Sequence, residues 1–461
     1  MGTLLKSSPR EILEGTILRT LLKLSVPSII AFTFHTTFNF VDRFFVSRLG
    51  ELELGALGMA FTVQSILIAI GSGTGIGASS LIARYIGAGK LKEARRAAEH
   101  TLLIIVGLSI VVSGSGPLLA PALFRLLGAS EQMLPHILSY ITIILYGCFF
   151  QFLAMIGNGI LRGEGNMVWP MQVMIVGTLV NIALDPILIF GLGPIPALGV
   201  QGAAIATVCG RGVSCVVLGL GLLARTNVIR IQLKNFRFAV RFVQGILGVG
   251  APTIVSQLSH SLGLSLLFIL LRPYGDQAKA AFTMGFTYQQ IAILPLIGIA
   301  QGTLTMAGQN YGAGNYQRIR AIMSRALAFS FVLMSVFALV FILARKQFVL
   351  VFTHKQEILT IGTTMLVIFS LGFPFLSGRI ILSSLFQGLG MGFKALFLNL
   401  AQMLVFAIPL ALLLSVLLGL EGIWAGMGLA NFLSALLGLL WAARTSRNLG
   451  RSSQTASEAT P

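Results

Sequence analysis

Two carboxylates lie inside apolar runs that are long enough to cross a membrane. Asp42 lies in the run over residues 29–49 and Asp185 in the run over residues 168–192, whereas the other twelve acidic residues fall at or near the ends of apolar segments. A carboxylate at bilayer depth is costly, and such residues usually belong to an ion or proton pathway. The fold therefore has to shield two acids from lipid, and we expect both acids to be functional.

The apolar runs predict a polytopic membrane protein. The chain has 461 residues, of which 56% are apolar and 10% charged, and its mean hydropathy is +0.90. Soluble domains do not have this composition. Runs of about 20–30 residues span a hydrocarbon core of roughly 30 Å as helices. We count twelve, at residues 15–47, 54–83, 97–124, 133–161, 167–192, 199–223, 240–271, 278–308, 321–344, 358–386, 395–419 and 422–443.

Little of the chain remains outside these runs for a soluble catalytic domain. The sequence contains no Ser/His/Asp constellation and no metal-ligand spacing. The segment 87–90 imitates the end of a phosphate-binding loop, but it lacks the leading glycine and the following Ser or Thr. We therefore predict that the chain is not an enzyme, has no catalytic residues and uses no cofactor.

The positive charge follows the predicted topology. The formal net charge is +18, and with both termini in the cytoplasm 22 of the 32 Lys and Arg residues fall on the cytoplasmic side and 8 outside. This asymmetry is the positive-inside rule, and it fixes the orientation. We therefore expect a multi-pass protein of the cytoplasmic (inner) membrane. Its basic residues are expected to meet anionic lipid headgroups, and nucleic acid is excluded as a partner.

The chain is an internal duplication at an offset of 225 residues. Pro27 recurs as Pro252, the pattern of residues 56–64 recurs at 281–289, and the Gly-Ala-Gly turn at 87–89 recurs at 312–314. Each repeat holds six predicted spans, and an even number of spans preserves the orientation. The predicted fold is therefore an all-α membrane protein of twelve transmembrane helices in two parallel six-helix repeats, the N-lobe and the C-lobe. Rocking transporters have this design.

The domain boundaries follow from the repeat. We expect a cytoplasmic, interfacial N-terminal segment over residues 1–14, the N-lobe over 15–223 and the C-lobe over 240–443. A basic cytoplasmic linker over 224–239 joins the lobes, and a disordered cytoplasmic tail is expected over 444–461. The offset places leucines at the positions equivalent to Asp42 and Asp185. A cation site built on these acids would therefore belong to the N-lobe alone.

The residues around Asp185 suit a cation or a proton. Asn181 and Asp185 are four residues apart and share a helix face. Pro186 removes a backbone N–H, which frees the carbonyl group of Ile182. Together these groups make an oxygen-rich site. The alternatives are a kink whose polar groups satisfy one another and, for Asp42, neutralisation by Arg43 near the outer interface.

Other polar residues inside the spans are weaker candidates. Each has a structural interpretation beside the functional one: helix packing for amides, backbone bonding for Thr, and a satisfied core position, which we favour, for His. Arg211 is costly in mid-span and is expected to pair with a carboxylate or to face water. The candidates are Asn158 and Thr207 for the cation site, and His35, Gln64, Arg211, His260, Gln289 and Gln290 for a substrate cavity.

Several motifs together resemble the multidrug and toxic compound extrusion (MATE) family. They are GNGILRGEG at 157–165, NIALDP at 181–186, GQNYGAGN at 308–315 and QGLG at 387–390. The resemblance extends from about Leu18 to Ala443. It implies a V-shaped protein with a central cavity between the lobes. It also implies an antiporter that expels amphipathic, often cationic, compounds in exchange for H⁺ or Na⁺.

The distribution of acids is similar to the DinF-like and archaeal branch of that family, whose carboxylates lie in the N-lobe. By this resemblance the cation site, a sodium site if Na⁺ is the coupling ion, comprises Asp42, Asn181, Asp185 and Thr207, with Asn158 nearby. The archaeal pattern has a tyrosine four residues before the first-span Asp, and here that position is Phe38. The hydroxyl group of that tyrosine is therefore missing, and Phe38 is expected to line the cavity.

We thus expect a multidrug efflux antiporter that works by alternating access, as a monomer, on small amphipathic or cationic substrates. The runner-up is a flippase of the same superfamily for a lipid-linked saccharide. It would be expected to show a cationic central cavity and additional spans, and only Arg211 and Arg379 are candidates for that charge. A channel, the third class, predicts passive flux. The residues leave the choice between Na⁺ and H⁺ open.

Overall fold

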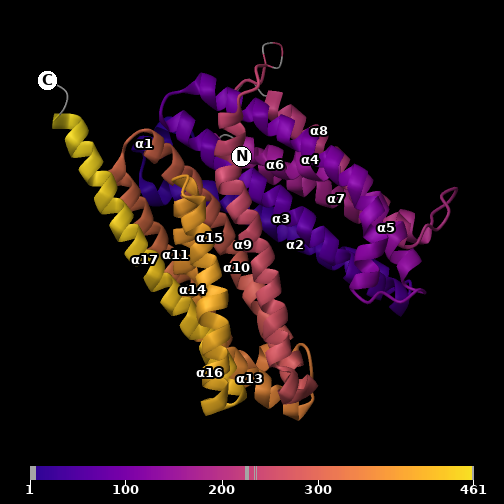
Figure 1. Cartoon of the computed structure of the whole chain (residues 1–461). Helices are drawn as coiled ribbons and strands as arrows, with labels where there is room; N and C mark the ends of the chain where they lie inside the picture. Colours follow the sequence, from indigo (N-terminus) through magenta and orange to yellow (C-terminus); the bar gives the residue numbers. More distant parts are fainter. Residues whose placement is uncertain (1–6, 224–227, 233, 235, 459–461) are drawn as a thin grey trace. The chain divides into compact units, whose positions relative to one another are not determined.

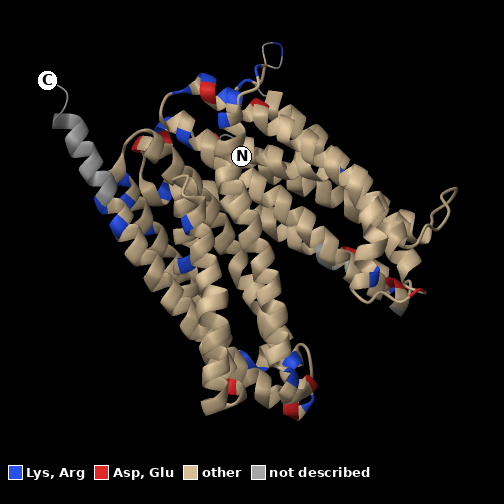
Figure 2. Ribbon diagram, viewed as in Figure 1, with Lys and Arg blue, Asp and Glu red and all other residues tan. Residues whose placement is uncertain are grey.

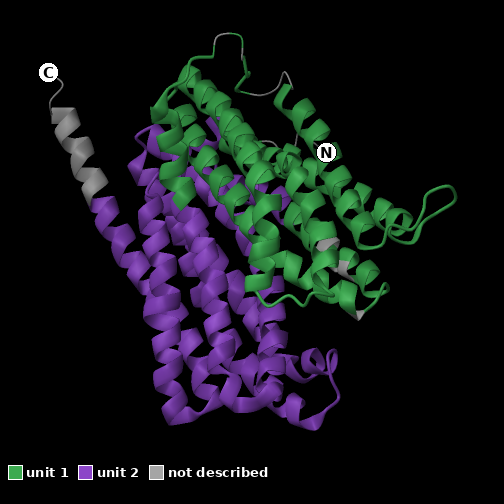
Figure 3. Cartoon of the chain, turned by 45° about the vertical axis from the view of Figure 1, so that its right-hand side comes forward, with its two compact units in different colours: residues 1–8, 30–251 green, residues 9–29, 252–461 purple. Residues whose placement is uncertain are grey.

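The computed structural model describes residues 7–223, 228–232, 234 and 236–458, without the side chains of 38–40, 43, 51 and 448–458. These residues form helices joined by short turns (Figure 1). The chain divides into two compact units, coloured in Figure 3. Unit 1 holds residues 1–8 and 30–251, and unit 2 holds residues 9–29 and 252–461.

The helices of the described residues have the lengths that a membrane requires. Ten of them are long and apolar enough to cross a bilayer, and two bent pairs raise the number to twelve if each pair is one span. The class of all-helical membrane protein is therefore confirmed. Figure 2 shows long stretches without Lys, Arg, Asp or Glu, and these charged residues gather toward the helix ends. Which side faces the cytoplasm remains a prediction.

The two bent spans occupy equivalent places in the duplication. Helices α5 (Leu134–Tyr146) and α6 (Cys148–Gly163) meet at 52°, and α13 (Gln356–Leu371) and α14 (Phe373–Gly388) meet at 45°. The residues at the breaks, Gly147 and Gly372, are matched by the offset of 225. A Cβ atom at Gly147 would lie 2.5 Å from the side chain of Val208, and one at Gly372 would lie 2.9 Å from the Cα atom of Gly428. Both bends therefore lie where the span packs closely on a neighbouring helix.

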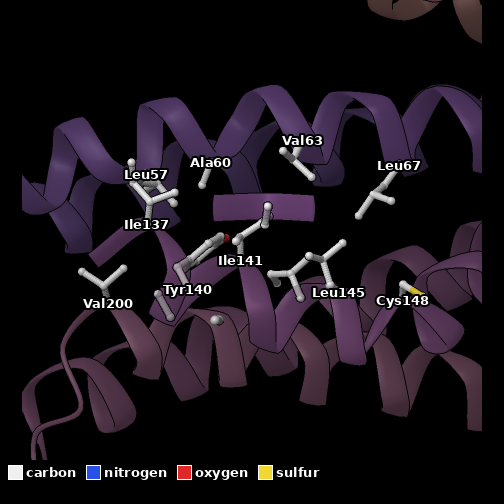
Figure 4. Close-up of a cluster of buried hydrophobic side chains, with 14 of the residues drawn as sticks. Leu57, Ala60, Val63, Leu67, Ile137, Tyr140, Ile141, Leu145, Cys148 and Val200 are labelled. Carbon is white, nitrogen blue, oxygen red and sulfur yellow. The ribbon is translucent and has the colours of Figure 1, made fainter. Parts of the chain in front are cut away.

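Unit 1 is built around an apolar core that includes the residues of Figure 4. Its other close contacts run through glycines: a Cβ atom at Gly159 would lie 2.3 Å from the carbonyl oxygen of Gly75, and one at Gly77 would lie 2.1 Å from that of Ile246. Small residues let backbones approach in this way. Besides α5 and α6, the helices lying wholly in unit 1 are α3 (Glu51–Gly87), α4 (Leu91–Leu126), α7 (Val168–Phe190) and α8 (Val200–Leu223).

Two helices contribute residues to both units. They are α2 (Ile17–Ser47) and α9 (Val240–Leu270), and the unit boundary falls after Ile29 in the first and after Ala251 in the second. Each boundary lies within three residues of a repeated proline, Pro27 or Pro252. The predicted lobe boundaries come from the sequence repeat, whereas the units come from the contacts within the structure. The lobe boundaries therefore stay a prediction.

Unit 2 carries the N-terminal helix α1 (Pro9–Glu14). Ile12 is buried, and its carbonyl oxygen accepts hydrogen bonds from Asn310 and Arg318 at 3.3 Å each. Residues 9–14 of the predicted N-terminal segment are therefore held to this unit through the carbonyl group of Ile12. Besides α13 and α14, the remaining elements are the short 3-10 turn η2 (Arg272–Tyr274) and α10 (Gly275–Gly312), α11 (Tyr316–Leu343), α12 (Arg345–Leu350), α15 (Gly392–Leu400), η3 (Ala401–Ala407), α16 (Ile408–Leu418) and α17 (Leu420–Glu458).

Helix α17 continues to Glu458, beyond residue 443, where the sequence predicts a disordered tail to begin. Its continuation over 444–447 has a physical reason. Thr445 is buried and accepts a hydrogen bond from Lys394 at 2.8 Å, and Ser446 accepts bonds from Arg320 through its hydroxyl and carbonyl oxygens. Polar side chains at the end of the span therefore anchor these residues.

Backbone hydrogen bonds hold the described part of the linker against unit 1. The Glu164 carboxylate accepts the N–H groups of Val228 at 3.3 Å and Ile229 at 3.2 Å. His100 accepts the N–H of Ala239 through Nε2 at 2.8 Å. Since Nε2 is the acceptor there, the ring proton lies on Nδ1, which is 2.7 Å from the carbonyl oxygen of Arg96.

This anchoring predicts the effect of Glu164→Gln. Hydrogen bonds to a charged group are worth about 1.5–3 kcal/mol each, and the amide retains only one acceptor oxygen. We expect trypsin to cleave the purified variant several-fold faster than the wild type at the exposed Arg230 and Arg237. The control is Glu131→Gln, which alters only a surface pair with Arg125. Equal cleavage rates in both variants would contradict the role of Glu164.

Candidate functional site: a buried polar cluster in unit 1

Close packing of α7 against α8 creates the centre of the site. A Cβ atom at Gly210 would lie 2.7 Å from the carbonyl oxygen of Gly177, and one at Gly202 would lie 2.2 Å from that of Leu188. The two helices therefore touch backbone to backbone. The same Cβ atom at Gly210 would lie 3.1 Å from the Cβ atom of Asn181. This contact places the face of α7 that carries Asn181 and Asp185 against α8.

Asn181 joins the two helices through its amide. Its nitrogen lies 3.3 Å from the Asp185 carboxylate and 3.5 Å from the Thr207 hydroxyl. With the amide turned over, Nδ2 donates to Asp185 at 3.1 Å and Oδ1 accepts the backbone N–H of Thr207 at 3.2 Å. We adopt the turned amide because it gives each amide atom a complementary partner. All three side chains are at most 3% exposed, and Asp185 is fully buried.

Asp42 belongs to the same cluster. It lies on α2 in the part assigned to unit 1 and is 7% exposed. Its charge acts on Asp185, on Tyr140 of α5 and on Arg211 of α8. The structure therefore brings both intramembrane acids to one place, although 143 positions separate them in the sequence. Hydrogen bonds within each helix cannot produce this arrangement; it depends on packing.

Tyr140 is a member of the cluster that the sequence analysis missed. Figure 4 shows its side chain among the apolar residues of unit 1. The residue is 1% exposed, and its hydroxyl group accepts a hydrogen bond from Gln64 at 2.7 Å. A buried tyrosine hydroxyl group needs a polar partner. A tyrosine inside the apolar run 133–161 therefore indicates a buried polar partner. Gln64, predicted as a cavity residue, is the residue that satisfies it.

Arg211 sets the charge of the cluster. It is half-buried in the middle of α8, and its Nη1 atom has no hydrogen-bond partner among the described residues. The guanidinium is permanently charged. With Asp42 and Asp185 both ionised, the three groups carry a net charge of −1. One monovalent cation would therefore neutralise the cluster.

The remaining predicted residues have different environments. His35 is half-buried and feels the charge of Arg211, so it adjoins the cluster. Asn158 is 3% exposed, and no hydrogen bond among the described residues reaches its Oδ1 atom. The side chain of Phe38 lies outside the described residues.

The other candidates belong to unit 2. Gln289 is 9% exposed, whereas Gln290 and His260 have exposed side chains. The interpretation as a core histidine, which the sequence favours, does not fit His260, because that position lies on an exposed face of α9.

The donor set of the cluster is made of oxygen atoms. Among the described residues no three His, Cys, Asp or Glu side chains converge in a way that could hold a metal ion. The oxygen donors that the cluster could offer are instead the Asp185 and Asp42 carboxylates, the Thr207 hydroxyl and the carbonyl group of Ile182, which the proline at position 186 leaves without its helical N–H partner. Hard monovalent cations prefer such oxygen ligands, and a carboxylate pair also takes up a proton. The arrangement therefore suits Na⁺ or H⁺.

The chain matches a known family in both of its halves. The sequence model of the MatE family matches residues 27–187 and 252–413. The two matches begin 225 residues apart, which is the offset of the repeat. Together they cover more than half of the chain.

Relatives and a solved structure match over almost the whole chain. The chain is 27% identical to a FAD transporter of Shewanella oneidensis over 426 residues, covering 92% of this chain and 94% of the relative. It is 25% identical to the probable multidrug resistance protein YoeA of Bacillus subtilis, covering 92% and 93%. A structure described as the outward-facing conformation of a multidrug resistance MATE family transporter superposes with a TM-score of 0.90 at 30% identity, covering 98% of each chain.

A glycine substitution tests how α7 and α8 build the cluster. A side chain in Gly210→Val would push Asn181 and Gly177 away, whereas Gly212→Val enters space where nothing lies within 4 Å. A ligand at 100 times its Kd stabilises a protein by about 2.7 kcal/mol. We expect Na⁺ or a fall in pH to raise the melting temperature of the wild type and of Gly212→Val. We expect no such rise for Gly210→Val.

Proposed function

The chain belongs to the MatE family of membrane transporters, and on that premise we propose that it is a secondary active multidrug exporter. In this proposal it expels small amphipathic, often cationic compounds by alternating access. The driving force is the inward movement of H⁺ or Na⁺. The observation that carries the proposal is the buried cluster of Asp42, Asp185 and Arg211 in unit 1.

The charge of this cluster supports coupling to one cation. A buried net charge of −1 is costly in a medium of low dielectric constant. Binding one H⁺ or Na⁺ removes that charge and changes which packing of α2 against α7 and α8 is favoured. Antiport then requires that the cation and the substrate favour different conformations of the protein. The proposed cation site is Asp42, Asn181, Asp185 and Thr207, with Asn158 as an additional candidate.

The positions of the acidic residues also support assignment of the chain to one branch of the family. The intramembrane carboxylates lie in the first repeat, while Asp276, Glu357 and Glu421 of the second repeat lie at or near the beginning of helices. We therefore assign the chain to the DinF-like and archaeal branch. We also propose the topology of the sequence analysis: N-lobe 15–223, C-lobe 240–443, linker 224–239, both termini in the cytoplasm and a monomer in the inner membrane.

A second candidate concerns the substrate. The relative from Shewanella oneidensis is named a FAD transporter, and a flavin nucleotide is an amphipathic anion rather than a cation. A flippase for a lipid-linked substrate is the other alternative. Export of a flavin nucleotide and flipping of a lipid-linked substrate would each require a positive charge in contact with the substrate. Arg211 and Arg379 are the intramembrane candidates for that charge.

Transport in proteoliposomes tests the proposal. A fluorescent cationic dye and FAD are offered in parallel under separately imposed Na⁺ and pH gradients. We expect one gradient to drive uptake of at least one compound against its own concentration gradient. Asp42→Asn and Asp185→Asn should each lower this uptake at least tenfold, because each variant removes the charge that the cation neutralises.

The control is Asp276→Asn, which removes an exposed carboxylate at the start of α10. This variant should transport like the wild type. Driven uptake that survives in Asp42→Asn and in Asp185→Asn would refute coupling at this cluster. Passive flux that follows only the gradient of the dye would identify a channel.

A further inference from the structure

A second intramembrane cation lies in unit 2, away from the two buried carboxylates. Arg379 is half-buried in α14, nine residues before Gly388, which is about 14 Å of helix. An arginine is always protonated in proteins. The membrane-spanning part of unit 2 therefore contains a permanent positive charge. The repeat does not require it, because the equivalent position in the first half is Ala154.

Neutral groups hold this guanidinium in place. The Nη1 atom of Arg379 donates to Oδ1 of Asn399 on α15. The amide nitrogen of Asn399 in turn donates to the Ser383 hydroxyl at 3.1 Å and to the carbonyl oxygen of Ala395 at 2.9 Å. Asn399 thus uses both of its donors on unit 2, which fixes its oxygen atom toward Arg379. The side chain is oriented but not neutralised.

Part of the guanidinium has no partner. The Nε atom of Arg379 is buried and has no hydrogen bond within the described residues. The ion pairs described in unit 2 join Lys23 to Glu11, Arg10 to Glu14 and Lys279 to Asp276, and Arg379 takes part in none of them. Arg211 differs in this respect, since the Asp42 charge lies near it. A partly buried charge without an ionic partner is costly, and an anionic ligand would offset that cost.

The helices around Arg379 leave the regular α geometry. The π-helical segment η3 begins directly after Leu400. It ends at Ala407, two residues before Pro409. Gly263 of α9 packs on this segment so closely that a Cβ atom there would lie 2.2 Å from Met403. His260 lies one turn before Gly263 on α9, and it interacts electrostatically with Arg379. Single π-helical turns inside helices are frequent at functional sites.

We propose that Arg379, oriented by Asn399, is the centre of an oxyanion-binding site in the second repeat that takes a phosphate or carboxylate group of an amphipathic molecule. A guanidinium presents N–H groups in a plane that matches the oxygen atoms of these anions, and it can bind two of them at once. Asn399 occupies one N–H of the guanidinium, and the Nη2 side of the group is left for this contact. His260 of α9 is a candidate second donor.

As a subsite for an exported compound, this site rests on the function proposed above. It predicts that anionic or zwitterionic amphipathic compounds are bound as well as cationic ones. The same chemistry fits the headgroup of an anionic lipid. Binding measured on the purified protein is independent of ion-driven transport, so a failure of one proposal is distinguishable from a failure of the other.

The test compares two flavins that differ by one phosphate group. Binding of FMN and of riboflavin is measured by fluorescence on the full chain in nanodiscs of phosphatidylcholine. We expect FMN to bind at least tenfold more tightly than riboflavin, and we expect Arg379→Gln to abolish this preference. The matched control is Arg345→Gln, which removes an exposed arginine of unit 2 that bonds only to the backbone of Ile342 among the described residues.

A second variant controls for misfolding, and a second lipid composition identifies the ligand. Asn399→Leu keeps the charge but not its orientation, and it should weaken FMN binding without changing riboflavin binding. In nanodiscs that contain phosphatidylglycerol, weaker FMN binding would show that a lipid headgroup occupies the site, and unchanged binding would assign it to soluble anions. FMN that binds no better than riboflavin, including no binding of either, or a preference that survives in Arg379→Gln, would overturn the proposal.

Discussion

The structure of the first repeat depends on the burial of two carboxylates beside one guanidinium. Each of these charges would be costly alone in a low-dielectric environment. Together Asp42, Asp185 and Arg211 leave a single negative charge, which one cation removes. Close packing makes this possible, because the glycines of α7 and α8 bring Thr207 against Asn181, which lies beside Asp185. The apolar core of unit 1 encloses this cluster, and the net negative charge that remains is the reason to expect a bound cation.

The duplication supplies two equivalent scaffolds that carry opposite chemistry. Both halves contain a span bent at a matched glycine, and both have a repeated proline near the residue of α2 or α9 at which the unit assignment changes. The first half keeps its two acids, whereas the second half has leucines at those positions and adds Arg379 and a π-helical segment. In our proposals the repeated fold divides its tasks, with cation binding in one half and anion binding in the other.

Much of this was accessible from the sequence, because a membrane restricts the structures that a chain can form. Apolar run lengths and the offset of 225 predicted the helical class and the repeat, and the spacing of Asn181 and Asp185 predicted their shared face. Tyr140 was missed because its partner, Gln64, is 76 positions away. The short helix α1 and its bonds to Asn310 and Arg318 were likewise not predictable, since they join segments about 300 positions apart.

Counting the cations bound by the purified protein tests the central claim most directly. Na⁺ titrations followed by calorimetry, and H⁺ titrations followed by a pH indicator, would be compared for the wild type and for the double variant Asp42→Asn with Asp185→Asn. The account predicts one H⁺ or Na⁺ per chain that the wild type binds and the double variant does not. A cation that remains bound in the double variant, or a wild type that binds none, would contradict it.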